Sequence, residues 1–113
     1  MEAEIAHLLT RQDGPDGFVY LLCVKTDGNY PCVNGSALFV ELEAGDIWKI
    51  GETTQINGGR YSEKLLNSIG TGGVQQIPII YGNQREIKIY EKYMIYGYYY
   101  KYGHLPPGNK IFR

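Results

Sequence analysis

The sequence predicts an α+β fold, in which a small, mainly antiparallel three-stranded sheet is flanked by helices and can take one extra strand. Short aromatic and β-branched runs bounded by turn residues indicate strands in the first half of the chain. In the second half, apolar side chains recur at three- and four-residue spacing, which is typical of amphipathic helices. The 113 residues suit one domain and can bury a core without disulfides. We therefore expect 1–113 to be a single domain.

Residues 1–16 form a lead-in segment that closes with several turn-forming residues. The apolar run 18–24 predicts the first strand, and 47–51 predicts a later strand of the same sheet. Between them, 25–46 is expected to be an insertion. Its alternating residues 37–42 favour the extra strand, and its remainder is rich in turn signals and is predicted to be loop.

The second half of the chain predicts helix, strand and helix. A helix is expected over 60–68, where apolar side chains recur every fourth residue, and a strand over 76–81. Pro78 lies inside that strand, which indicates an edge position because proline cannot donate to a neighbouring strand. The longest helix is predicted over 86–102, with Gly97 as the position where it could bend.

Charge is distributed unevenly along the chain although the net charge is only −1. Residues 1–48 carry two basic and eight acidic side chains, whereas 49–113 carry nine basic and four acidic ones. A basic second half favours phosphate binding there, although solvated surface charges explain the same pattern. The sequence contains no apolar run long enough to span a membrane and shows no cleavable export signal.

Cysteine and tyrosine usage adds two expectations. Cys23 lies in an apolar run and is expected in the core, while a disulfide to Cys32 would require an oxidising compartment. Seven of the eleven tyrosines fall between 90 and 102, interleaved with lysines. Such a cluster can stack on unpaired bases, but we favour the interpretation that it lines the core and its wet margin.

Five positions appear in an order that carries a resemblance. Phe18-Val19-Tyr20 is followed by Lys49-Ile50-Gly51, and then by Arg60, Glu91 and Asn109. In this order the chain resembles the GIY-YIG nuclease superfamily, from Gly17 to Asn109. It is most similar to the branch in which lysine replaces the second tyrosine. The resemblance implies an endonuclease that hydrolyses phosphodiester bonds in DNA, with RNA not excluded.

The resemblance also implies a role for each charged position. Glu91 would be the single protein ligand of a divalent cation, Mg²⁺ or Mn²⁺, which accepts a lone carboxylate and fills its shell with water and phosphate. The alternative is a solvated Glu91 paired with Lys88. Tyr20 would contact the attacking water, which requires a lowered pKa if it acts as a base, and its alternative role is that of a core tyrosine at the end of a strand. Arg60 would grip two phosphate oxygens, and its alternative role is a surface ion pair.

Four further residues are assigned supporting parts. Lys49 stands in place of the second tyrosine, and contacts phosphate or stabilises a deprotonated Tyr20. Gly51 lets the backbone approach closely, and Thr53 can donate a hydroxyl to phosphate. Asn109 cannot titrate, so it can only fix local geometry.

The ending 106–110 resembles toxin domains of the same superfamily. That likeness implies an antibacterial toxin held in check by an immunity protein, acting in the cytoplasm of a cell into which it is delivered. Two other classes stay open: an inactive module of the same fold that binds nucleic acid or protein, and a purely structural interaction domain. The acidic first half and the Lys49 replacement motivate the inactive binding module.

Overall fold

The computed structural model describes residues 16–35, 37–54 and 62–110. In chain order its elements are β1 (Asp16–Val24), β2 (Gly28–Pro31), β3 (Phe39–Leu42), β4 (Ile47–Thr53), α2 (Glu63–Asn67), β5 (Val74–Asn83) and α3 (Gln84–Tyr102). Five strands and two helices in this order confirm the α+β prediction for the described part of the chain.

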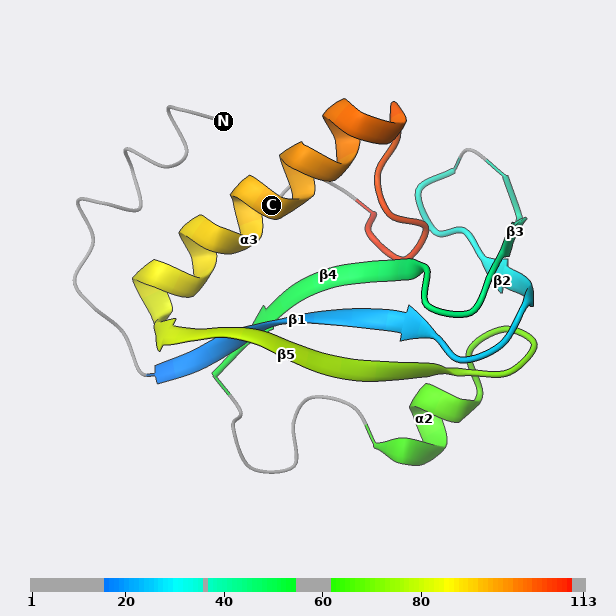
Figure 1. Ribbon diagram of the computed structural model, residues 1–113, viewed down its shortest axis with the longest axis horizontal. Coiled ribbons are helices and arrows are strands. Elements are labelled where there is room, and N and C mark those ends of the chain that lie inside the picture. Colours follow the sequence, from blue (N-terminus) through cyan, green and yellow to red (C-terminus); the bar gives the residue numbers. More distant parts are fainter. Residues whose placement is uncertain (1–15, 36, 55–61, 111–113) are drawn as a thin grey trace.

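The main sheet has three antiparallel strands in the order β4-β1-β5, with β1 in the centre (Figure 1). The strands β2 and β3 pair with each other in a separate two-stranded sheet at one end of the molecule. The predicted insertion 25–46 therefore forms its own small sheet between β1 and β4. This leaves β4 and β5 as the edge strands of the main sheet.

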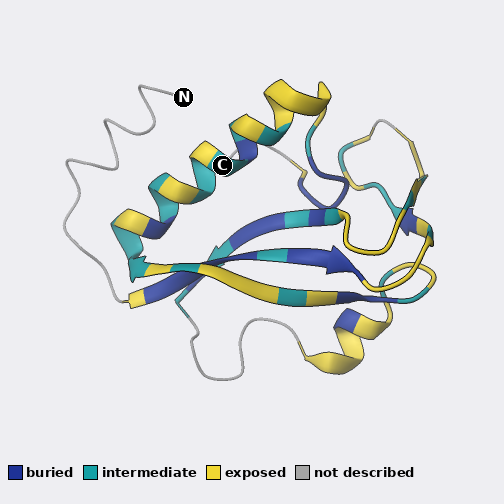
Figure 2. Cartoon of the chain, viewed as in Figure 1, coloured by how far each residue is buried: buried dark blue, intermediate teal, exposed yellow. Residues whose placement is uncertain are grey.

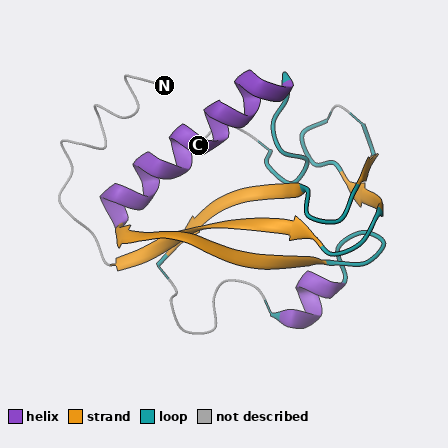
Figure 3. Ribbon diagram, in the orientation of Figure 1, coloured by secondary structure: helices purple, strands orange, loops and turns teal. Residues whose placement is uncertain are grey.

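Alternate side chains of β1 point to opposite faces of the sheet and create two cores. One face packs around Phe18, Tyr20 and Leu22, together with Leu66 of α2. The other face packs around Val19 and Ile50, and is covered by Ile87 and Ile95 of α3. Figure 3 shows the two helices on opposite sides of the sheet. In consequence, a residue's position on β1 or β4 decides which helix it faces.

One element was missed by the sequence prediction. Residues 28–31 were expected to be loop, but they form β2. Tyr30 explains the strand, because its buried ring packs against Gly70 and its hydroxyl donates to the carbonyl oxygen of Thr26 at 2.7 Å. A four-residue strand held by one buried tyrosine leaves little pattern in the sequence.

The helices differ from the predictions mainly at their ends. Within the described residues α2 is five residues long and is capped by Ser62, so it is shorter than the predicted 60–68, of which 60 and 61 lie outside the described residues. α3 starts earlier than predicted, at a capping box in which Asn83 and Glu86 bond each other's backbone N–H groups. It runs through Gly97 without interruption. No helix in the described ranges is long and apolar enough to cross a membrane.

Candidate functional site

Tyr20 and Gly51 lie directly opposite each other on β1 and β4. Tyr20 is fully buried, and a Cβ atom added to Gly51 would come within 2.4 Å of the tyrosine hydroxyl and 2.6 Å of Cζ. The absence of a side chain at Gly51 therefore makes the space that the phenol occupies. The two tripeptides that carry the family resemblance are neighbours in register, with the hydroxyl of the first over the glycine of the second.

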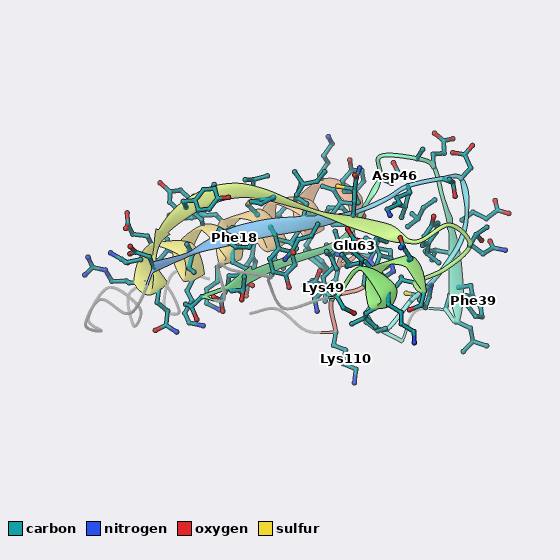
Figure 4. The ribbon with its side chains drawn as sticks, turned by 90° about the horizontal axis from the view of Figure 1, so that it is seen from below. Phe18, Phe39, Asp46, Lys49, Glu63 and Lys110 are labelled. Carbon is teal, nitrogen blue, oxygen red and sulfur yellow. The ribbon has the colours of Figure 1, made fainter. Side chains whose placement is uncertain are left out.

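Lys49 and Thr53 lie on the same face of β4 as Gly51. Lys49 pairs with Leu22 and Thr53 with Phe18, and both partners belong to the core beneath α2. Thr53 is buried, whereas Lys49 is half-buried. Figure 4 looks onto this side of the molecule and labels Lys49. The structure thus gathers the phenol, the lysine and the threonine on one strip of the β1–β4 pair.

Asn109 binds the outer edge of β4 through its side chain. Its Oδ1 accepts a hydrogen bond from the N–H of Ile50, and its Nδ2 donates to the carbonyl oxygen of Ile50, both at 2.9 Å. Next to it, the N–H of Gly108 donates to the carbonyl oxygen of Trp48. The segment after α3 is therefore anchored to the edge of β4 without forming a strand, and Asn109 fixes local backbone geometry at the centre of the second tripeptide.

Glu91 lies one helical turn from both Ile87 and Ile95, which are fully buried against the sheet. This spacing places Glu91 on the sheet-facing side of α3, where it is half-buried. Lys88, the partner considered for it from sequence, bonds Glu52 of β4 at 3.0 Å. Because α3 covers the face of Val19, Glu91 approaches the sheet from the side opposite to Tyr20.

The described residues do not bring all predicted site residues into one cluster. Tyr20, Lys49, Gly51 and Thr53 share one face, Asn109 lies at the edge of β4, and Glu91 lies on the far face. Arg60 lies outside the described residues. Sequence reasoning also passed over Glu52 as a site residue, although strand alternation places it with Ile50 on the face of α3.

The number of metal-binding side chains that gather in the described residues determines which kind of cation site they can form. Among 16–35, 37–54 and 62–110, no three His, Cys, Asp or Glu side chains gather closely enough to bind a metal together. Glu52 is already neutralised by Lys88. A hard cation held by Glu91 would therefore have to take its other ligands from water and phosphate oxygens, because the described residues offer no cage made of protein ligands alone.

Comparison of the chain with protein-family models, with curated proteins and with solved structures returned no match.

Proposed function

We propose that the chain is a metal-dependent endonuclease of the GIY-YIG type that hydrolyses phosphodiester bonds in DNA. The observation that supports this proposal is the register of β1 and β4, in which Tyr20 lies over Gly51 while Asn109 binds both backbone groups of Ile50. Three segments that are far apart in sequence meet at the second tripeptide. Tyr20, the second tripeptide and Asn109 are three of the five positions that carry the resemblance.

In this proposal each side chain has a chemical task. Tyr20 contacts the attacking water through its hydroxyl, Lys49 offsets negative charge on the phosphate, and Arg60 holds two phosphate oxygens. Glu91 would hold Mg²⁺ or Mn²⁺, which when bound supplies charge stabilisation and a water of lowered pKa. Asn109 acts by positioning β4 and exchanges no proton.

The test is nicking of supercoiled plasmid DNA over a titration of Mg²⁺ and Mn²⁺. Glu91→Ala should abolish metal-stimulated cleavage, and the matched control Glu41→Ala should not, because Glu41 is an exposed carboxylate of β3. Circular dichroism melting of each variant checks that it is folded. Equal cleavage by the parent and Glu91→Ala would overturn the proposal.

The toxin role is a narrower form of the same proposal. It is supported by the likeness of 106–110 to toxin domains of the superfamily, and it implies an immunity protein as partner and the cytoplasm of the target cell as the place of action. Expression in a bacterial host should arrest growth and cause DNA breaks, and Arg60→Ala should relieve both. Normal growth with the intact protein accumulating would exclude this role.

A second candidate is an inactive module of the same fold that binds nucleic acid or protein. The complete burial of Tyr20, together with the approach of Glu91 from the opposite face of the sheet, favours it. This module would bind DNA in a salt-sensitive way without cleavage at any metal concentration. Cleavage that depends on Glu91 would rule it out.

A further inference from the structure

Most tyrosines of α3 are more exposed than a core-lining role requires, although Tyr98 packs against the core of the α3 face as expected. Five of them, Tyr90, Tyr93, Tyr99, Tyr100 and Tyr102, are between 39 and 78 % exposed, and none of the seven is buried. Scattered apolar residues on a surface need no explanation, but aromatic rings concentrated on one helix indicate a binding surface. Figure 2 shows exposed positions in a stripe along α3 on the side away from the sheet, and helical spacing places Tyr93 and Tyr100 in this stripe.

The centre of this stripe has a defined shape. Tyr93 and Tyr100 are seven residues apart, so their side chains point the same way, about 10 Å apart along the helix axis. Gly97 lies between them on the same side, and a Cβ atom added there would meet no atom within 4 Å. The two rings therefore flank a notch of bare helical backbone.

Among residues 16–35, 37–54 and 62–110, no packing contact explains the glycine at position 97. A glycine inside a helix costs about 1 kcal/mol relative to alanine. Gly17, Gly51 and Gly108 are each crowded by neighbouring atoms, but Gly97 faces open space. The missing side chain therefore leaves the helical backbone uncovered between the two rings, as far as the described residues show.

The charges around the stripe are mainly positive. α3 carries Arg85, Lys88, Lys92 and Lys101, against Glu86 in the first turn and Glu91 on the sheet side. Lys88 and Lys92 are four residues apart and therefore lie on the same side of α3. This side faces β4, because Lys88 bonds Glu52 of β4. Basic side chains thus border the rings on the flank that leads towards Glu91.

We propose that this outer surface of α3, defined by Tyr93, Gly97 and Tyr100 with Lys92 beside them, binds single-stranded nucleic acid. Bases stack on the two rings and pass over the glycine notch, while lysine side chains contact phosphates. A duplex fits poorly, because its bases already stack on each other and a convex helix cannot enter that stack. The inference rests on the proposed nuclease function and deepens it by naming nucleic acid with unpaired bases as the class of substrate that the chain holds.

Binding can be measured without cleavage, so the two proposals fail separately. Fluorescence anisotropy in EDTA with a labelled 12-nucleotide oligo-dT should show binding that weakens as salt rises. A 12-base-pair duplex should bind at least tenfold more weakly, and oligo-rU distinguishes RNA from DNA. Tyr100→Ala and Tyr93→Ala should each weaken oligo-dT binding about tenfold, whereas Tyr100→Phe, which keeps the ring, should bind like the parent.

Two matched controls separate stacking from stability. Tyr81→Ala removes another exposed tyrosine, on β5, and should leave oligo-dT binding unchanged. Gly97→Ala should raise the melting temperature but weaken binding, because the added methyl group fills the notch.

Three results would overturn the inference: unchanged affinity in a folded Tyr93→Ala, Tyr100→Ala double variant, equal affinity for the duplex, or sedimentation showing that these tyrosines hold two copies of the chain together. If the parent protein binds oligo-dT but does not nick plasmid DNA, the proposed nuclease function is contradicted and the proposed binding surface is not.

Discussion

The carboxamide of Asn109 pairs with both backbone groups of Ile50, at 2.9 Å for each hydrogen bond, and so takes the place of a neighbouring strand along β4. Both partners are buried, which means that water cannot replace the amide when it is removed.

Asn109→Ala should therefore lower the free energy of unfolding by about 2–4 kcal/mol, because it leaves a buried N–H and a buried C=O without partners. Urea denaturation measures the change. Asn67→Ala is the matched control, since the exposed amide of Asn67 accepts a hydrogen bond from Lys25 in an exposed contact, and it should cost less than about 0.5 kcal/mol. A cost for Asn109→Ala no larger than that of the control would contradict this account of the β4 edge.

Gly51→Ala should destabilise the protein by steric overlap with Tyr20, whose Cζ lies 2.6 Å from the position of the new Cβ. We expect a loss of about 2–3 kcal/mol. Tyr20→Leu combined with Gly51→Ala should lose less than the sum of the single changes, because the two residues share one space. Thermal melts of the four proteins complete the cycle, and strict additivity would show that the phenol does not need this glycine.

The sequence predicted the main sheet well, because its strands carry strong local patterns. The edge position that Pro78 predicted for its strand is confirmed, because β5 is an edge strand of the main sheet. The backbone N–H and C=O groups of Ile50 point away from β1 and bond Asn109. Because this direction alternates along a strand, the N–H and C=O groups of Gly51 point towards β1, and those of its partner Tyr20 point towards β4. Pro78, opposite Tyr20, then faces the open edge of β5, where its missing N–H costs no hydrogen bond.

The site was harder to predict than the sheet, for two physical reasons. The order of residues in the sequence does not say which face of the sheet a helix covers, so the separation of Glu91 from Tyr20 emerged only from the packing of α3. The tyrosines of α3 were expected at the margin of the core, because periodicity shows that a helix is amphipathic but not that its aromatic residues remain uncovered. The position of Arg60 stays a prediction.

Stability should fall at alkaline pH through Cys23 and Tyr98. Burial raises the pKa of the Cys23 thiol, with a further increase from Asp46. Burial also raises the pKa of the Tyr98 hydroxyl, to which Tyr102 and Asp46 add. Both groups bind their protons more tightly in the folded state, so their contribution is complete below the unfolded pKa values, about 8.5 and 10, and is lost as pH rises above them.

Urea denaturation between pH 7 and 11 tests this linkage. Cys23→Ala should flatten the decline that begins near pH 8.5, even though it lowers stability at pH 7 by removing a buried side chain. Cys32→Ala serves as the comparison, because it removes the other cysteine, whose Sγ donates to Asn34 Oδ1 at 3.0 Å. An identical decline in Cys23→Ala and the parent would remove Cys23 from the explanation.

The capping box at the start of α3 should be measurable as a coupled pair. The side chain of Asn83 accepts a hydrogen bond from the N–H of Glu86 at 2.9 Å, and Glu86 Oε1 accepts one from the N–H of Asn83 at 3.1 Å. Asn83→Ala should cost about 1 kcal/mol, since it leaves a first-turn N–H without its acceptor. Glu86→Gln keeps an acceptor and should therefore cost less stability than Glu86→Ala. The difference in stability between the parent and Glu86→Gln then measures the interaction of the negative charge with the helix dipole. Asn83→Ala should also speed amide hydrogen exchange in the first turn of α3, while exchange at Ile95 stays slow. This measurement matters because α3 carries both Glu91 and the tyrosine surface. Equal acceleration along the whole helix would mean that the cap holds α3 on the sheet and does not only close its end.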